Sequence, residues 1–178
     1  YQQLCRQVAP LVQAQVGPPV GLVGIWSGGA WLADRLQKDL GLQGPSGTLS
    51  ITLHRDDYAE RGLSTTAGAT RLPFEVDGRH IILIDDVLYT GRTIRAALNE
   101  LFDFGRPARV SLAVLVDRGG RELPIEAQCA AARLTLPDSQ RLSLAHDAQG
   151  RLTAATSTEP ELGGNDSIAG HSGAITFA

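Results

Sequence analysis

The sequence predicts an α/β protein built on a parallel β-sheet with helices packed against it. Short apolar runs bounded by turn residues, typical of strands buried on both faces, alternate along the chain with amphipathic helical segments. Such alternation favours parallel strands joined by helical crossovers. The chain has 178 residues, of which 43% are hydrophobic and 20% charged. It is therefore long enough to bury a core within one domain.

The first third of the chain contains two predicted helices and two predicted strands. Apolar residues recur at helical spacing over residues 1–16, which predicts an amphipathic helix. Residues 20–26 are apolar between turn residues, as expected of a buried strand. A second helix is predicted over 30–40, and the polar–apolar alternation of 48–53 predicts a half-buried strand.

The middle of the chain combines a long polar segment with the strongest strand signal. Residues 54–72 show no periodicity, and loops of that length are usually functional lids or unstructured chain. The Asp77-Gly78 pair favours a type I′ turn, which predicts a hairpin with arms at 74–76 and 79–84. A helix with one apolar face is predicted over 93–104.

The last part of the chain ends in a segment without a pattern. Residues 110–116 are predicted to form another buried strand, and 141–146 with 151–156 a late hairpin. We expect one domain over 1–156. Residues 157–178 are rich in small and polar residues and are predicted to be a disordered tail.

Three predicted strands lead directly into small, polar or charged residues. These are Ser27-Gly28-Gly29, Asp85-Asp86 and the run from Asp117 to Gly120. In open α/β sheets, ligands bind beyond the carboxyl ends of the strands. Adjacent carboxylates accept hydrogen bonds from vicinal hydroxyls or help to hold a divalent cation, and Thr90–Thr93 enters a helix whose unpaired N–H groups suit a phosphate. The combination predicts a site for a phosphorylated sugar.

The residues around this acidic pair resemble a known family. The segment from Ile82 to Thr93 resembles the phosphoribosyl-diphosphate (PRPP) binding motif of type I phosphoribosyltransferases. With Gly105-Arg106-Pro107 and the run from Leu115 to Ile125, it resembles the PyrR family, which comprises pyrimidine operon regulators that also act as uracil phosphoribosyltransferases. The resemblance implies the type I phosphoribosyltransferase fold, a central parallel sheet flanked by helices, with a flexible loop and a small antiparallel addition.

The resemblance also implies roles for individual residues. Asp85 and Asp86 would hold the ribose hydroxyls and Mg²⁺, and with Arg55 they are the candidate catalytic residues. The other implied PRPP-binding residues are Thr90, Gly91, Arg92, Thr93, Ser27, Gly28 and Gly29. Asp117 and Arg118 are the candidate base-binding residues. Arg55, Asp56, Asp57 and Arg61 belong to the implied flexible loop, which would close over the site to exclude water.

The implied reaction converts uracil and PRPP to UMP and pyrophosphate, with Mg²⁺ carried on the pyrophosphate. The implied partners are PRPP, a pyrimidine base and further copies of the chain. The alternative is a nucleotide-sensing regulator that acts on RNA with little or no turnover. A net charge of −3, with Arg6 the only basic residue before Arg35, argues against RNA binding. The run Gln128–Ala132, which lacks the aromatic residue that the family has there, favours the regulator or a different base.

Other classes of protein fit the sequence less well. No apolar run reaches the ~18 residues that span a bilayer, so we expect a soluble, cytoplasmic protein. Cys5 and Cys129 form no CxxC pair, which disfavours a zinc cluster. A hydrolase nucleophile elbow at Ser27 would need Gly where Ile25 stands. The glycine motifs of dinucleotide-binding and P-loop proteins are absent from the sequence.

Overall fold

The structure is a computed structural model that describes residues 1–13, 17–51, 69–137, 140–146, 152–158 and 173–176. Strands and helices alternate through the first two thirds of the chain, as the sequence predicts. In chain order they are α1 (Gln2–Gln13), β1 (Val20–Ile25), α2 (Gly28–Asp39), β2 (Gly47–Leu49), β3 (His80–Leu88), α4 (Arg92–Asp103), β4 (Arg109–Asp117), β5 (Cys129–Arg133), β6 (Gln140–His146), β7 (Leu152–Thr158) and β8 (Gly173–Thr176).

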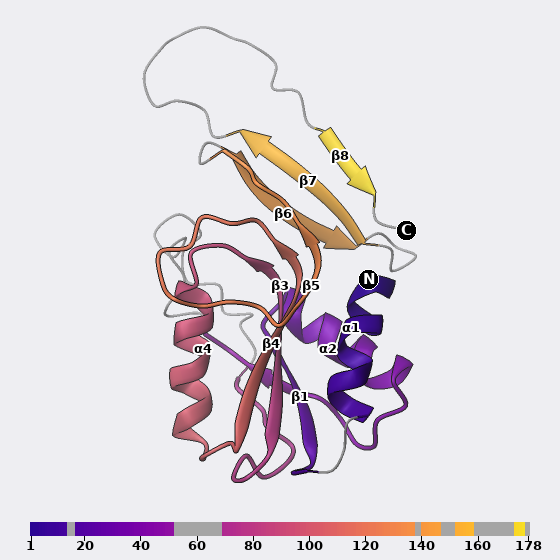
Figure 1. Cartoon of the computed structure of the whole chain (residues 1–178), viewed down its shortest axis with the longest axis vertical. Coiled ribbons are helices and arrows are strands. Elements are labelled where there is room, and N and C mark those ends of the chain that lie inside the picture. Colours follow the sequence, from indigo (N-terminus) through magenta and orange to yellow (C-terminus); the bar gives the residue numbers. More distant parts are fainter. Residues whose placement is uncertain (14–16, 52–68, 138–139, 147–151, 159–172, 177–178) are drawn as a thin grey trace, which may run out of the picture.

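Five of these strands form one parallel sheet in the order β2-β1-β3-β4-β5 (Figure 1). β3 is the central strand and pairs with β1 on one side and β4 on the other, with Ile82 opposite Leu22 and Ser111. The predicted central parallel sheet is confirmed. The carboxyl ends of β1, β3 and β4 consequently meet at one edge, which is the edge where a ligand site is expected.

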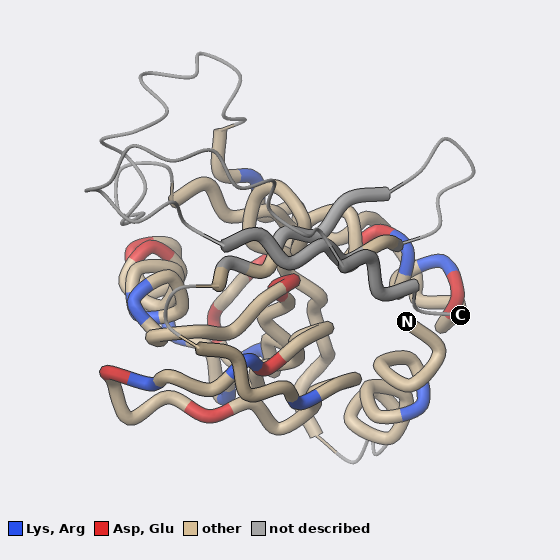
Figure 2. Tube along the Cα trace, turned by 90° about the horizontal axis from the view of Figure 1, so that it is seen from above, with Lys and Arg blue, Asp and Glu red and all other residues tan. Residues whose placement is uncertain are grey.

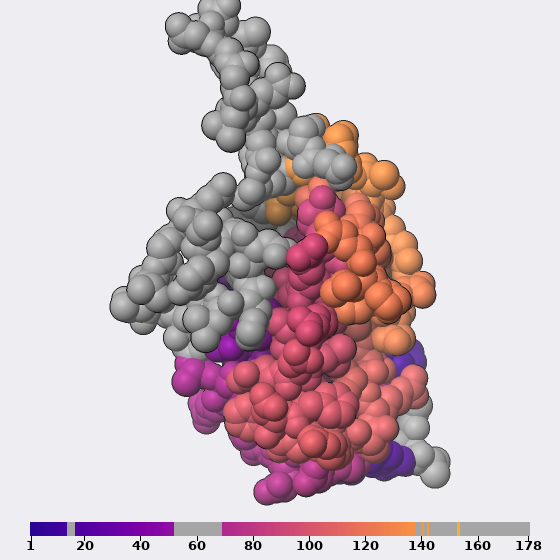
Figure 3. Space-filling view, turned by 90° about the vertical axis from the view of Figure 1, so that its left-hand side faces the viewer, coloured from indigo at the N-terminus to yellow at the C-terminus, as the bar shows by residue number. Residues whose placement is uncertain are grey.

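Helices cover both faces of this sheet, with α4 on one face and α1 and α2 on the other (Figure 1). Because side chains alternate along a strand, Ile81 and Leu83 of β3 pack in the core beneath α4, whereas Ile82 and Ile84 pack beneath α1 and α2. Figure 3 shows the face of the molecule that α4 covers. The apolar faces predicted for the helices are thus the ones that they bury.

One predicted strand arm is wrong. Residues 74–76 form no strand, because both edges of β3 are already occupied by β1 and β4. The Asp77-Gly78 turn is present, with Gly78 at φ 67°. It bonds to the segment before β4 instead of closing a hairpin: the Gly78 N–H donates to the Arg106 carbonyl and the Arg106 N–H donates to Asp77 Oδ1.

The sequence reasoning missed β5, which pairs in parallel with β4 and completes the sheet. Antiparallel strands β6 and β7 lie where the late hairpin is predicted, and β8 pairs with β7 to make a second sheet (Figure 1). Within the segment predicted to be a tail, Gly173–Thr176 form strand β8. Most of the rest of that segment lies outside the described residues. In the part of the chain that the structure describes, no helix is both long and apolar enough to cross a membrane.

Candidate active site

The acidic pair lies inside β3, not in the turn after it, because the strand continues to Leu88. Asp85 is only 2% exposed, whereas Asp86 is half-buried. Asp85 Oδ1 accepts the Asp86 N–H at 3.0 Å, and Asp86 Oδ1 accepts the Val87 N–H at 2.8 Å. Each carboxylate is therefore oriented by the backbone of the next residue.

The glycine turn after β1 lies directly against this acidic pair. A Cβ built on Gly28 would overlap the Asp86 carboxylate, and one on Gly29 would overlap the Ile84 carbonyl oxygen. Only glycine permits this approach without displacing a neighbour. Ser27 stands at the start of α2, its side chain makes no capping hydrogen bond, and the Trp26–Ser27 peptide bond is cis. The glycine turn and the strand that carries the acidic pair are thus in direct contact.

The predicted phosphate turn follows β3 and leads into α4. Gly91 is the N-cap residue of α4 and has a φ of 94°, a conformation that favours glycine. The Arg92 N–H donates to Thr90 Oγ1 at 3.3 Å. The Arg92 side chain donates to Glu122 Oε2 from Nε at 2.8 Å and from Nη2 at 2.5 Å, and this ion pair is about half exposed. Thr93 is half-buried in the first turn of α4.

Arg121 joins the loops that follow β3 and β4, and the sequence reasoning assigned it no role. Its Nη1 donates to the Tyr89 carbonyl at 2.6 Å and its Nε to the Ile125 carbonyl at 2.9 Å. Its Nη2 pairs with Asp117 Oδ1 at 2.5 Å. The available signal was the four-residue spacing of Asp117 and Arg121 within the motif. Arg121 therefore connects the loop after β3 to the end of β4 and the loop that follows it.

The two candidate base-binding residues, Asp117 and Arg118, have different surroundings. Burial by itself would raise the pKa of the Asp117 carboxyl, but hydrogen bonds from Arg121 and the Gly119 N–H, together with the charges of Arg121 and Arg133, outweigh it and lower that pKa. Asp117 is consequently an ionised structural partner of Arg121. Arg118 is 6% exposed, and its guanidinium carbon lies 3.7 Å from the centroid of the Tyr89 ring.

Arg55, Asp56, Asp57 and Arg61, with most of the predicted lid, lie outside the described residues. His80 begins β3 at the opposite edge of the sheet from Ser27, and its Nε2 lies 3.0 Å from Ser111 Oγ. Within the described ranges, no three His, Cys, Asp or Glu side chains are grouped to hold a metal ion. A metal at Asp85 and Asp86 would need further oxygen ligands from the substrate.

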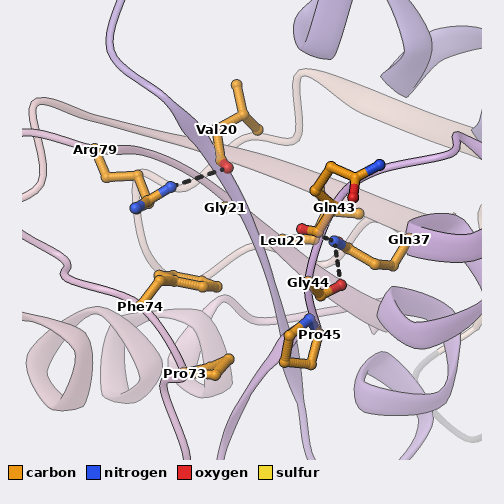
Figure 4. Close-up of a pocket in the computed structure, with 10 residues that line it drawn as sticks. All are labelled: Val20, Gly21, Leu22, Gln37, Gln43, Gly44, Pro45, Pro73, Phe74 and Arg79. Carbon is orange, nitrogen blue, oxygen red and sulfur yellow. Dashed lines mark hydrogen bonds between the residues drawn. The ribbon is translucent and has the colours of Figure 1, made fainter.

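A pocket at the other end of the sheet does not compete with this site. It lies beside the first residues of β1 and is shown in Figure 4. Gln37 Nε2 donates there to the carbonyls of Gln43 at 3.1 Å and Gly44 at 3.0 Å. Arg79 Nη1 donates to the Val20 carbonyl at 3.4 Å and its guanidinium lies over the Phe74 ring. These polar groups already have partners within the fold.

Comparisons with known proteins agree with this geometry. The family described as "Phosphoribosyl transferase domain" matches residues 9–136. The "Bifunctional protein PyrR" of Ralstonia nicotianae is 52% identical over 165 residues, covering 90% of this chain and 92% of the relative. The protein of the same description from Pseudomonas entomophila is 48% identical over 136 residues, covering 76% of this chain and 78% of its own length.

Solved structures show the same fold. A hypoxanthine phosphoribosyltransferase from Staphylococcus aureus superposes with a TM-score of 0.53 at 19% identity, covering 77% of this chain and 73% of that one. At that identity the likeness concerns the fold alone, and it confirms the predicted type I arrangement of a parallel sheet between helices.

Proposed function

Because the chain belongs to the phosphoribosyl transferase domain family, and within it to the PyrR proteins, we propose that it converts uracil and PRPP to UMP and pyrophosphate. One observation carries the proposal: the Gly28 turn lies against the Asp86 carboxylate at the carboxyl edge of the sheet. The phosphate turn begins two residues after the strand that holds that carboxylate. A pyrophosphate, a ribose and a 5′-phosphate follow one another in PRPP in the same order.

Each part of PRPP has a matching group in this arrangement. The backbone N–H groups of Ser27, Gly28 and Gly29 would approach the pyrophosphate, since glycine lets an anion come close to the backbone. Asp85 and Asp86 would accept hydrogen bonds from the two ribose hydroxyls. The turn from Thr90 to Thr93, which leads into α4, would bind the 5′-phosphate through N–H groups, hydroxyls and the helix dipole.

The acidic pair also fits Mg²⁺, which prefers one or two carboxylates together with substrate phosphates. Both Oδ1 atoms are engaged by backbone N–H groups, which fixes how the two carboxylates are presented. When bound, Mg²⁺ would neutralise charge on the pyrophosphate leaving group. Asp85 and Asp86 would hold it with oxygens of PRPP.

The proposed base subsite lies beyond β4, beside the acidic pair. The Arg118 N–H donates to the Leu88 carbonyl at 3.0 Å, so the two strand ends are directly joined. Asp117 frames this subsite through its ion pair with Arg121. We also expect from the family resemblance that the chain works as a homo-oligomer.

The first test is a substrate panel. The protein is incubated with Mg²⁺, PRPP and one base at a time, either uracil, cytosine or hypoxanthine, and pyrophosphate release is followed. We expect release with uracil, dependent on Mg²⁺, above the rate without a base. Pyrophosphate release that no base accelerates would contradict the proposed transfer.

A second candidate function is supported by the description of the relatives as bifunctional. The chain would then also bind RNA in response to a pyrimidine nucleotide. Acidic and basic residues are interspersed over the described part of the chain, with no stripe of one sign (Figure 2). Since phosphate contacts dominate RNA affinity, we expect a pyrimidine-leader RNA to bind at about micromolar affinity or weaker at physiological salt. A gel shift at nanomolar protein that depends on UMP would instead establish the regulator.

A further inference from the structure

Glu122 places a carboxylate beside the turn that is proposed to bind the 5′-phosphate. The Glu122 and Leu123 N–H groups both donate to the Thr90 carbonyl, at 3.0 Å and 3.1 Å. The Glu122 carboxylate accepts from the side chain of Arg92, the first residue of α4, whose Nε lies 2.8 Å from Oε2. A negative charge is therefore held against the turn that has to receive a negatively charged phosphate, and like charges repel each other.

The loop that carries Glu122 is held in place without this ion pair. Besides the two backbone bonds to the turn, Arg121 donates to the Tyr89 carbonyl at 2.6 Å. A Cβ built on Gly91 would lie 3.3 Å from Ile125 Cβ, so the loop also packs against the start of α4. The Glu122 carboxylate is consequently not needed to join the loop to the turn, and its effect is to be sought in its charge.

The ion pair between Arg92 and Glu122 is open to solvent. The Arg92 side chain is 54% exposed and the Glu122 side chain 51%. Exposed ion pairs contribute little to stability, because water and salt screen them and both side chains lose freedom. The guanidinium is bound through one carboxylate oxygen, whereas a phosphate offers it two oxygens and roughly two negative charges. A phosphate at the turn therefore competes effectively with Glu122 for Arg92.

The position of Arg92 allows this exchange of partners. In an α-helix the Cα–Cβ bond tilts toward the N-terminus, so long side chains lean back over the preceding turn. Arg92 directly follows Gly91, the N-cap residue of α4, and its contact with Glu122 agrees with that direction. The first turn of α4 contains no acidic residue of its own, so Glu122 brings a negative charge there from another loop.

We infer that Glu122 is a positioning residue that holds Arg92 beside the phosphate turn and releases it to the 5′-phosphate of a bound ligand. The inference rests on the proposed function. Without a ligand, the carboxylate fixes the guanidinium beside the turn. With a ligand, Arg92 pairs with the phosphate, and part of the binding free energy is used to break the pair with Glu122. Glu122 therefore lowers the affinity for 5′-phosphates and speeds the release of UMP, since affinity differences between variants lie mostly in dissociation rates.

The test compares Glu122→Gln with the control Glu126→Gln. Glu126 is an exposed residue four positions further along the same loop, so each change removes one negative charge from that loop. Calorimetry measures the binding of UMP, ribose 5-phosphate and uridine. We expect Glu122→Gln to bind UMP and ribose 5-phosphate about 2- to 5-fold more tightly, the size of an exposed ion pair. Uridine, which has no phosphate, should bind as it does to the wild type, and Glu126→Gln should change none of the three affinities.

A second variant, Arg92→Gln, tests the other half of the pair. It should weaken UMP and ribose 5-phosphate by about 10-fold or more, the loss of a charge-assisted hydrogen bond, and leave uridine unchanged. Thermal unfolding of both variants should show the wild-type midpoint, because the pair is exposed.

A purely structural role for Glu122 predicts the opposite sign. Weaker or unchanged UMP binding by Glu122→Gln would overturn the inference, as would a gain that uridine or Glu126→Gln shares, or an Arg92→Gln variant with wild-type UMP affinity. If the wild type releases pyrophosphate with uracil in such a case, only the role of Glu122 is lost. A wild type that releases no pyrophosphate, yet shows the expected pattern with ribose 5-phosphate, would remove the proposed reaction and keep that role.

Discussion

Replacing Asp85 and Asp86 together with Asn is expected to abolish the use of PRPP while leaving the fold intact. Asn keeps the Oδ1 atom with which each side chain accepts the backbone N–H of the next residue. What it removes is the negative charge that favours ribose hydroxyls and Mg²⁺. A hydrogen bond to a charged group contributes roughly 1.5–3 kcal/mol, so the pair should cost about two to four decades in PRPP affinity.

The measurement is calorimetric titration of PRPP with Mg²⁺ into the double variant. Asp103→Asn is the matched control, since Asp103 is an exposed residue at the end of α4, away from the glycine turn. Single variants add a second comparison of unfolding temperature. Asp86→Asn, at the half-exposed position, should unfold at the wild-type temperature. Asp85→Asn changes a buried side chain, so its unfolding temperature is the more sensitive of the two. Unchanged PRPP affinity in the folded double variant would remove both residues from the site.

The parallel sheet could be predicted because its strands carry their own local signal. Residues 81–84 are four consecutive aliphatic residues that pack alternately into both cores, and no helix or exposed strand needs such a run. β5 gave no such signal, because Cys129 and the alanines after it are small residues without a β preference. The false arm at 74–76 followed from a turn that does exist. Whether a turn closes a hairpin depends on whether the neighbouring strand has a free edge, which is a property of the whole sheet.

The candidate site was predictable to a similar degree. The acidic pair and the glycine turn are sequence motifs, and the structure brings them into contact through Gly28 and Asp86. The burial of Asp85 was not predictable, because it depends on how far β3 extends past the aliphatic run. Arg121 was missed for a different reason. All of its acceptors but Asp117 are backbone carbonyls, among them those of Tyr89 and Ile125. Every residue has a backbone carbonyl, so the sequence does not indicate which one accepts.

Replacing Arg121 with Ala is expected to destabilise the protein by about 3 kcal/mol, because breaking a buried ion pair leaves one charge without its partner. The Asp117 side chain is 9% exposed and the Arg121 side chain 23%, so water can replace little of what is lost. The Tyr89 and Ile125 carbonyls lose their donor at the same time. Arg92→Ala is the matched comparison, because the partner of Arg92, Glu122, follows Arg121 in the same loop. Its ion pair with Glu122 is about half exposed on both sides, and such surface pairs contribute about 0–1 kcal/mol.

Arg121→Ala and Arg92→Ala are expected to differ in the stability that they lose. The pH dependence of that difference tests whether Asp117 is its source. The pKa of Asp117 is lowered in the folded state from 3.8, so its contribution to stability is fully present above pH 3.8 and is lost as the pH falls through the folded value. In Arg121→Ala the pairing charge is gone and burial acts to raise that pKa. The destabilisation, measured by urea unfolding, should therefore be largest near neutral pH and shrink once Asp117 is protonated. Equal destabilisation by Arg121→Ala and Arg92→Ala, or a difference that does not vary with pH, would mean that the Asp117 pair does not hold the two loops together.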